Sequence, residues 1–138
     1  PRPADVRPAD LDGDGDTDLL VADFGAFLTG NILLLKNSGV ADGSPQFESE
    51  VLDVRPGAVH LPVHDYNADG RLDFMALVTQ EYETVELFVN QGEAHFNVHH
   101  LWAAPDLTFG SSGIDLSDLD QDGDMDILYT NGEVLVND

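Results

Sequence analysis

One nine-residue pattern occurs three times in the chain, at residues 10–18, 65–73 and 118–126. It reads Asp, any residue, Asp or Asn, any residue, Asp, Gly, any two residues, Asp. Oxygen-bearing side chains therefore stand at positions 1, 3, 5 and 9, around a glycine at position 6. Ca²⁺ takes about six to eight oxygen ligands, which a short loop can supply from alternate residues while a glycine permits the sharp turn. The pattern predicts three calcium loops.

The predicted ligands stand at positions 1, 3, 5, 7 and 9 of each loop. Position 7 can offer its backbone carbonyl whatever its side chain, which accounts for an arginine there in the second loop. The second loop also has a neutral asparagine at position 3, so it carries fewer charges and is expected to bind more weakly. The full set is Asp10, Asp12, Asp14, Asp16 and Asp18; Asp65, Asn67, Asp69, Arg71 and Asp73; and Asp118, Asp120, Asp122, Asp124 and Asp126.

Two other interpretations of the loops are less consistent with the sequence. An EF-hand requires glutamate at position 12 and a helix on each side, whereas position 12 is Val21, Ala76 and Tyr129 here and strand-like runs follow. Ordinary acidic turns are also rich in Asp and Gly, but three copies in register argue against chance. Like charges about 4 Å apart cost on the order of 4 kcal/mol near a protein surface, so converging carboxylates need a cation.

The charge of the chain excludes several classes of partner. The 138 residues carry a formal charge of −22, and the loops hold five, three and five, or thirteen, of the 27 acidic residues. Three Ca²⁺ would leave about −16, an excess that argues against nucleic acid and against docking on anionic lipid. No run of 18 apolar residues is present, so no membrane insertion is expected. The absence of cysteine excludes a disulfide or a thiolate metal site.

The spacing of the loops predicts the architecture. They start at residues 10, 65 and 118, and apolar runs separated by Gly, Asn, Asp, Ser or Pro surround each of them, with no helical period. Four short antiparallel strands per repeat is the content of a propeller blade. The continuously apolar run 32–35 is expected to be buried on both faces, and 96–102 to form an outer edge. The predicted runs are 58–64 and 113–117 before the loops, 19–23, 74–79 and 127–130 after them, then 32–36, 85–90 and 134–137, and finally 47–54 and 96–102.

Through these loops the chain resembles the FG-GAP or VCBS-type repeats of calcium-binding β-propellers, which include the head of integrin α-subunits. The resemblance covers essentially the whole chain. The "FG" of the family name is present as Phe109-Gly110 before the third loop, is Pro56-Gly57 before the second, and the "GAP" is replaced in all three repeats. The variant is closer to VCBS-like bacterial repeats than to integrins. The resemblance implies an all-β fold in which each calcium loop joins the first two strands of a blade.

The expected organisation is a single repeat region, residues 1–138, with blades at about 1–54, 55–105 and 106–138. Eleven strands would make about 2.75 blades, whereas the resemblance implies a ring of about seven. A partial propeller exposes blade faces and open edges, which are association sites. The expected partners are therefore further blades, from the same parent chain or from other subunits. The start at Pro1-Arg2-Pro3, with no initiator Met, favours a fragment of a longer propeller.

The histidines and one serine segment are weaker candidates for chemistry. At about 3.3 Å per residue, His60 and His64 would lie near 13 Å apart on one strand, too far to share an ion easily. Ordinary surface or inter-blade positions are expected for the histidines, although cross-strand pairing of His64 with His95 or His99 stays open. The Gly-Ser-Ser-Gly segment 110–113 is predicted to be a flexible lead-in to a strand, because no helix follows it to bind phosphate.

Acidic and aromatic residues outside the loops are further candidates for chemistry. Paired carboxylates act in glycosidases, but Glu81, Glu83 and Glu86 are predicted to form a solvated acidic turn. Trp102 and Phe109 could stack on a sugar, yet they are expected to fill core or inter-blade space.

The sequence favours a non-catalytic calcium-binding module for extracellular recognition or adhesion. The resemblance implies that it binds proteins or glycans through loops opposite the calcium turns, with the ions structural. Extracellular calcium sites bind at about 10⁻⁴–10⁻³ M, which suits a secreted, periplasmic or cell-surface location. Two alternatives stay open. One is part of a propeller enzyme, such as a polysaccharide lyase or a hydrolase-associated propeller, with carboxylates, His or Tyr converging at the ring centre or rim. The other is a structural component of a larger assembly.

Overall fold

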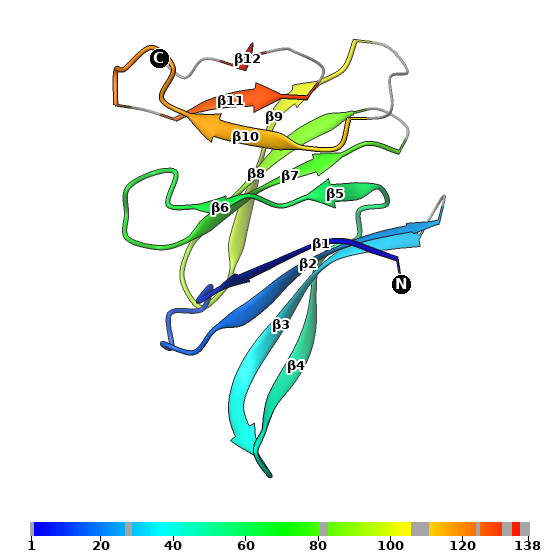
Figure 1. Cartoon of the computed structure of the whole chain (residues 1–138), viewed down its shortest axis with the longest axis vertical. Helices are drawn as coiled ribbons and strands as arrows, with labels where there is room; N and C mark the ends of the chain where they lie inside the picture. Colours follow the sequence, from blue (N-terminus) through cyan, green and yellow to red (C-terminus); the bar gives the residue numbers. More distant parts are fainter. Residues whose placement is uncertain are drawn as a thin grey trace.

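The computed structural model describes residues 2–26, 29–80, 83–105, 111–123, 125–130 and 134–135. In this part of the chain there are twelve β-strands and no helix, arranged as three antiparallel sheets (Figure 1). Each sheet contains one acidic loop between its first strands and lies within one of the predicted blade ranges. The all-β prediction is confirmed, and the arrangement is that of a partial β-propeller.

The first sheet has its four strands in chain order. Aliphatic residues stand in register across all of them, since Val6 lies opposite Val21, which pairs with Leu33, which in turn pairs with Val51. The hairpin between the last two strands turns at Asp42-Gly43, both with positive φ, which is the geometry that an Asp-Gly pair favours. The strands are β1 (Pro3–Ala9), β2 (Asp18–Ala26), β3 (Thr29–Ala41) and β4 (Ser44–Asp53).

The second sheet has the order β5-β7-β8-β9, and β6 also pairs with β7. The prediction of one continuous strand over 58–64 is wrong, because the run is interrupted at Leu61-Pro62. Proline has no N–H for the ladder, and the Leu61 N–H donates instead to the Asp5 carboxylate at 2.9 Å. The strands are β5 (Ala58–His60), β6 (Val63–His64), β7 (Asp73–Val78), β8 (Thr84–Asn90) and β9 (Phe96–Ala103).

The third sheet has three strands, β10 (Ile114–Ser117), β11 (Asp126–Tyr129) and β12 (Val134–Leu135), in chain order. The predicted runs 19–23, 32–36, 47–54, 74–79 and 85–90 all coincide with strands, although several strands are longer. Residues 136–137 of the run 134–137 lie outside the described part. The strand β9 is exposed along most of its length, as an outer edge should be.

Two apolar clusters hold the sheets together. Between the first and second sheets, Leu20 and Ile32 are packed with Phe74 and Phe88, whose rings stack with centroids 4.4 Å apart. Between the second and third sheets, Met75 and Leu77 belong to a cluster with residues of β10 and β11. The Trp102 ring packs edge-on against Tyr129 at 4.9 Å, which confirms its expected inter-blade position, whereas Phe109 lies outside the described residues.

The first sheet is covered on one face only. In the run 32–35, Ile32 and Leu34 are fully buried against the second sheet, while Leu33 and Leu35 on the other face are half-exposed. The prediction that this run is buried on both faces is therefore wrong in the described structure, because no sheet lies against the second face. That face remains apolar, with Val6 and Val51 both about half-exposed beside Leu33.

Candidate calcium loops

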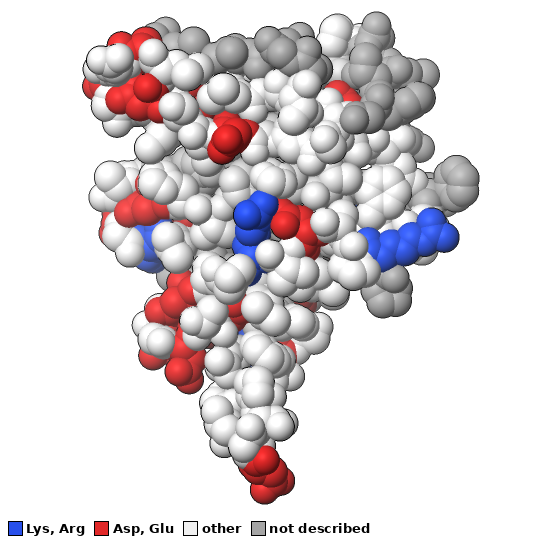
Figure 2. Space-filling model, viewed as in Figure 1, with Lys and Arg blue, Asp and Glu red and all other residues white. Residues whose placement is uncertain are grey.

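The acidic loops connect β1 to β2, β6 to β7 and β10 to β11, and the three loops lie along the same side of the molecule, on the left in Figure 1. Acidic atoms gather along this side of the surface (Figure 2). The position 6 glycines adopt the positive φ that the pattern requires, 94°, 88° and 103° at Gly15, Gly70 and Gly123. Position 4 is also left-handed in every loop, at Gly13, Ala68 and Gln121, which the sequence pattern did not indicate.

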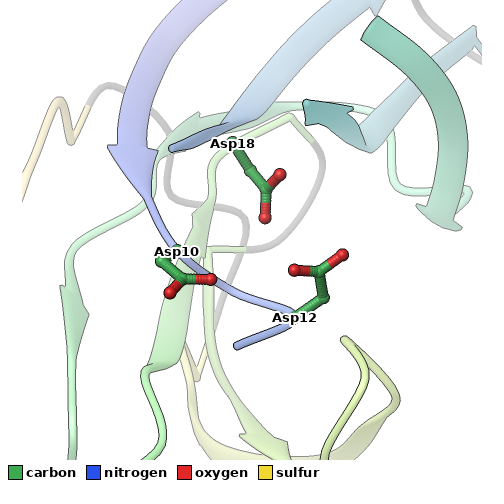
Figure 3. Close-up of side chains that lie close together, drawn as sticks. All are labelled: Asp10, Asp12 and Asp18. Atoms are coloured by element: carbon green, nitrogen blue, oxygen red, sulfur yellow. The ribbon is translucent and has the colours of Figure 1, made fainter. Parts of the chain in front are cut away.

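In the first loop, positions 1, 3 and 9 converge. One carboxylate oxygen each from Asp10, Asp12 and Asp18 lies within 4.8 Å of the other two, and the three side chains turn toward a common space (Figure 3). Oxygens bound to one Ca²⁺ at about 2.3–2.6 Å lie at most about 5 Å apart. The cluster therefore has the dimensions of a calcium site. Asp14 and Asp16 are exposed in the same loop but outside this cluster.

The third loop repeats this arrangement with Asp118, Asp120 and Asp126, again within 4.8 Å of one another. Asp118 Oδ1 is buried and has no hydrogen-bond partner among the described residues. A buried carboxylate oxygen without a donor is costly, and a cation would satisfy it. Asp122 is exposed in this loop, and Asp124 lies outside the described part.

The first carboxylate of each loop closes the turn through backbone amides. Asp10 accepts the N–H groups of Gly13 at 2.9 Å and Gly15 at 3.1 Å, and Asp118 accepts that of Gly123 at 3.2 Å. These bonds place the loop backbone around the carboxylates without using all of their lone pairs. The turn geometry is thus built into the loop.

The ninth-position aspartates anchor the loops in the sheets. Asp18, Asp73 and Asp126 are each 0% exposed. Asp18 accepts the backbone N–H of Leu11 at 3.1 Å with one oxygen and that of Asn37, on the third strand, at 2.9 Å with the other. In the second sheet, Asp73 makes the same two bonds to Tyr66 at 3.0 Å and Asn90 at 2.8 Å, and Asp126 accepts from Leu119 at 2.8 Å. Position 9 is therefore a structural junction as well as a potential ligand.

Two asparagines that sequence reasoning missed complete these junctions. Asn90 is 1% exposed, and its Nδ2 donates to Leu72 O at 3.1 Å and, across the sheets, to Leu11 O in the first loop at 2.8 Å. Asn37 occupies the equivalent place in the first sheet, and its Nδ2 donates, among the described residues, to Thr17 O alone, at 3.2 Å. Each is followed by a glycine two residues later that donates to the asparagine side chain. The repeated Asn-x-Gly is the signal that could have identified them.

The second loop does not form a triad of carboxylates. Asp65, Asp69 and Asp73 belong to no group of three acidic oxygens within 4.8 Å in the described structure, and position 3 is Asn67. The Asp69 carboxylate instead accepts hydrogen bonds from Asn67 Nδ2 at 2.9 Å and from the Arg71 guanidinium. This loop differs from the other two in charge and in bonding.

The acidic side chains respond to these surroundings. Partial burial, followed by the neighbouring carboxylates Asp18 and Asp14, raises the pKa of Asp12. Burial and three neighbouring aspartates likewise raise the pKa of Asp120. In the second loop the pKa of Asp69 is lowered, first by the backbone N–H of Arg71 and then by Asn67 and the arginine charge. The ionised forms of Asp12 and Asp120 are thus disfavoured unless a cation joins them.

The donor chemistry fits Ca²⁺ in the first and third loops. The converging atoms are all carboxylate oxygens. Hard cations such as Ca²⁺ prefer oxygen ligands, whereas many transition metals favour sites that offer nitrogen or sulfur. The dimensions of both clusters and the unpartnered Asp118 Oδ1 are consistent with an ion of this kind. The ligand set remains a prediction at all three loops.

The remaining acidic candidates have structural partners. Glu83 is 2% exposed and accepts hydrogen bonds from Ser111 N at 2.9 Å, Ser111 Oγ at 3.0 Å and Tyr129 Oη at 2.5 Å. Burial acts to raise its pKa, but the hydrogen bonds from Tyr129 and Ser111 outweigh it and lower the pKa. The prediction of a solvated turn is wrong for Glu83, and Ser111 is held rather than part of a flexible lead-in. Glu81 and Gly110 lie outside the described residues.

Glu86 is also buried, contrary to the predicted solvated turn. Its Oε1 accepts a bond from Arg55 Nη1 at 3.0 Å and lies 3.1 Å from His100 Nδ1. Arg55 also pairs with Asp53 at 2.7 Å, so it links the end of the first sheet to the middle of the second. These carboxylates join sheets and do not face each other as a catalytic pair would.

The histidines form no metal cluster in the described part of the chain, where the two acidic triads are the only groups of three. His60 lies near Asp5 and Arg7 at the first strands of the first two sheets, where Arg7 Nε donates to Asp5 at 2.9 Å. An open cavity of about 400 Å³, lined in part by Arg7, His60 and Asp115, lies beside them. Burial, the largest cause, lowers the pKa of His60.

Acidic loops at the same place in three successive antiparallel sheets, of four, five and three described strands, define a β-propeller-type repeat protein. The profile of the FG-GAP-like repeat matches residues 10–76 and 65–129, and the chain belongs to this family. Each match starts at the first residue of an acidic loop and ends in the strand after the next loop. No curated protein and no solved structure matches the chain significantly. FG-GAP repeats are typical of extracellular or surface proteins, and the described residues include no helix of the length and apolarity that a membrane crossing needs.

Proposed function

We propose that the chain is a non-catalytic, calcium-stabilised propeller module that recognises proteins or glycans outside the cell. The observation that carries this proposal is the convergence of Asp10, Asp12 and Asp18 in the first loop and of their counterparts in the third. A bound Ca²⁺ would supply the positive charge that these carboxylates lack. Because Asp18 also holds the third strand through Asn37, an ion there would stabilise the sheet as well as the turn.

The same proposal places the ligand-binding surface away from the calcium side. In Figure 1 the end of β2 and the start of β3, like the end of β7 and the start of β8, lie on the side opposite the acidic loops. Loops on a rigid β-scaffold are common binding elements. In the acidic loops, the carboxylates at positions 1 and 9 are already bonded to backbone N–H groups, so these loops are less suited to bind a partner. Sites that bind at about 10⁻⁴–10⁻³ M fill at extracellular calcium levels, which supports a secreted, periplasmic or cell-surface location.

Thermal unfolding with calcium and with chelator tests the structural role. At about 10 mM Ca²⁺, a site with a Kd of roughly 10⁻⁴–10⁻³ M stabilises the folded state by about 1.4–2.7 kcal/mol. For a chain of this length, that raises Tm by roughly 4–8 °C per site. Asp12→Asn should remove one site's share, whereas Asp42→Asn, in the exposed β3–β4 turn, should change nothing. A Tm that is the same with calcium and with chelator would refute the calcium role.

We also propose that a further blade, from the parent chain or another subunit, covers the open face of the first sheet. The supporting observation is that residues on the open face of the first sheet are equivalent to buried residues of the second sheet. Leu19 pairs with Leu35 as Phe74 pairs with Phe88, and the phenylalanines are buried against a neighbouring sheet. Light scattering on the chain should show concentration-dependent association that Leu33→Lys abolishes. If both proteins are monomers at all concentrations, this face does not join copies of the chain.

A catalytic role is less well supported. The group closest to what an enzyme would need is Asp5, Arg7 and His60 beside the open cavity. Asp5 Oδ2, however, already accepts the Leu61 N–H and the Arg7 Nε–H at 2.9 Å each, so the carboxylate serves to join two strands. A polysaccharide activity screen beside a glycan-binding array separates the possibilities. Turnover that His60→Ala abolishes would overturn the non-catalytic proposal.

A further inference from the structure

The three acidic loops differ at position 7, which is Asp16, Arg71 and Asp124. The Arg71 guanidinium is fixed at two points, because Nη2 pairs with Asp69 Oδ2 and Nε donates to the backbone carbonyl of Asn90 at 2.9 Å. Asn67 Nδ2 adds a second donor to the Asp69 carboxylate at 2.9 Å, and the Arg71 backbone N–H is a third, donating to Asp69 Oδ1 at 2.9 Å. A cation and two neutral donors therefore already satisfy Asp69.

The first loop lacks this arrangement. Asp14, the residue equivalent to Asp69, accepts the backbone N–H of Asp16 at 2.8 Å. In the described part of the chain, no lysine or arginine side chain forms an ion pair with a carboxylate of the first loop. Five aspartates stand in this loop with no basic residue, against three aspartates and one arginine in the second. The two loops share a backbone turn but differ in the group that neutralises the negative charge of their carboxylates.

We infer that Arg71 is a resident counter-cation that keeps the second loop folded without metal, whereas the first and third loops depend on an ion. This inference rests on the proposed calcium loops. It does not require that the second loop be unable to bind Ca²⁺; it requires that the turn survive when Ca²⁺ is removed. The charge of the guanidinium replaces the ion at Asp69, and its bond to Asn90 O fixes it to β8.

The position of Arg71 gives this device a role beyond its own loop. Asn90, whose carbonyl accepts Arg71 Nε, also donates to Leu11 O in the first loop at 2.8 Å. A cavity of about 290 Å³ lies between the two loops and is lined by Asp10, Asp12 and Arg71 among others. The second loop therefore anchors the junction of the first two sheets whether or not calcium is bound, and the first loop is attached to it through Asn90.

Amide hydrogen exchange in chelator tests the inference at single residues. The reporters are the N–H groups bonded to the first carboxylate, those of Asp69 and Gly70 on Asp65 and those of Gly13 and Gly15 on Asp10. After correction for intrinsic rates, the second-loop amides should exchange about ten- to a hundredfold more slowly than the first-loop amides, because the pair of Arg71 with Asp69 stabilises the whole turn against opening.

Two reciprocal variants sharpen the test. Arg71→Asp gives the second loop the aspartate that the other two loops have at position 7 and should remove its slow exchange in chelator. Asp16→Arg places a cation at position 7 of the first loop and should slow exchange at Gly13 and Gly15 by about tenfold. Asp16→Arg keeps the inference falsifiable should Arg71→Asp fail to fold.

Equal exchange in the first and second loops of the native chain in chelator would overturn the inference. So would unchanged exchange in both variants. Failure of the calcium proposal would look different, because added Ca²⁺ would then leave the first and third loops unchanged while the comparisons in chelator still report on Arg71.

Discussion

The side chain of Asn90 links two acidic loops that belong to different sheets, and its removal should be unusually costly. Asn90 Nδ2 donates to Leu11 O at 2.8 Å and to Leu72 O at 3.1 Å, and Oδ1 accepts the Gly92 N–H at 2.9 Å. Asn90→Ala removes all three bonds but keeps the backbone N–H that binds Asp73. The perturbation is therefore confined to the side-chain links.

The magnitude follows from burial. A hydrogen bond contributes about 0.5–1.5 kcal/mol net, and a buried group left unpaired costs about 1–3 kcal/mol. Because Asn90 is 1% exposed, water cannot readily replace the bond to Leu11 O. We expect Asn90→Ala to lower the free energy of unfolding by about 2–4 kcal/mol, which corresponds to a fall in Tm of roughly 6–12 °C.

The chain supplies its own control. Asn37 binds the equivalent groups within its sheet, Thr17 O at 3.2 Å and the Gly39 N–H at 3.0 Å, but its side chain has no bond to a second sheet in the part of the chain that the structure describes. Since the Thr17 bond is exposed to solvent, Asn37→Ala should cost less than about 1 kcal/mol. Asn90→Asp keeps the acceptor for Gly92 but loses both donated bonds, so it should be at least as damaging as Asn90→Ala.

Urea unfolding at saturating calcium measures these differences, with the slope of each transition checked for two-state behaviour. Equal losses for Asn37→Ala and Asn90→Ala would refute the reasoning, because they would show that the link to Leu11 contributes nothing. A neutral Asn90→Asp would point to the turn at Gly92 as the source of the stability instead.

Three further predictions concern residues outside the carboxylate triads. Arg55→Ala should cost about 2–3 kcal/mol in urea unfolding, because it leaves Glu86 buried without its main partner, and Glu86→Leu in the same chain should recover part of that loss. The folded-state pKa of Glu83 lies below its ordinary value of 4.5. Its contribution to the free energy of unfolding is therefore present above about pH 4.5 and is lost as the pH falls through the folded pKa. The stability difference between the native chain and Glu83→Gln should shrink between about pH 6 and pH 3, and a constant difference would contradict this. Ala68 has a φ of 56°, so Ala68→Gly should raise Tm by roughly 1–3 °C as the left-handed strain is relieved, and a lower Tm would show that this strain is absent.

The parts of the fold that the sequence predicts are those set by local pattern. The loops could be predicted because their carboxylates bond to backbone amides within the same nine residues, around Gly15 and its equivalents. The strands could be predicted from apolar runs between turn residues. The strand break at Leu61-Pro62 was also visible as a proline, but a run of apolar residues on both sides outweighed it. Its reason is non-local, since the Leu61 N–H is used by Asp5, 56 residues earlier.

The errors share one physical cause, which is the stacking of sheets. Glu83 is acidic and near a turn, so local chemistry predicts solvent exposure, yet Tyr129, 46 residues later, covers it and donates to it. Glu86 likewise meets Arg55, 31 residues earlier. No periodicity within one repeat can reveal which side chain of the next repeat will approach, because that depends on the twist and offset of neighbouring sheets.

The equivalence of Asn37 and Asn90 makes it possible to test by mutation whether a further blade covers the first sheet. Asn37 comes two residues after Leu35, which pairs with β2, and Asn90 comes two residues after Phe88, which pairs with β7. The backbone N–H of each asparagine donates to the position 9 aspartate of its own sheet. Asn90 also reaches the loop of the preceding sheet, whereas Asn37 faces the uncovered side of the first sheet. If a further blade covers that side, Asn37 Nδ2 gains a loop carbonyl and becomes buried. Asn37→Ala should then cost about 2–4 kcal/mol in the assembled protein, against less than about 1 kcal/mol in the chain alone. An Asn37→Ala cost that stays small in the assembly would show that the face is not covered by a blade of this kind.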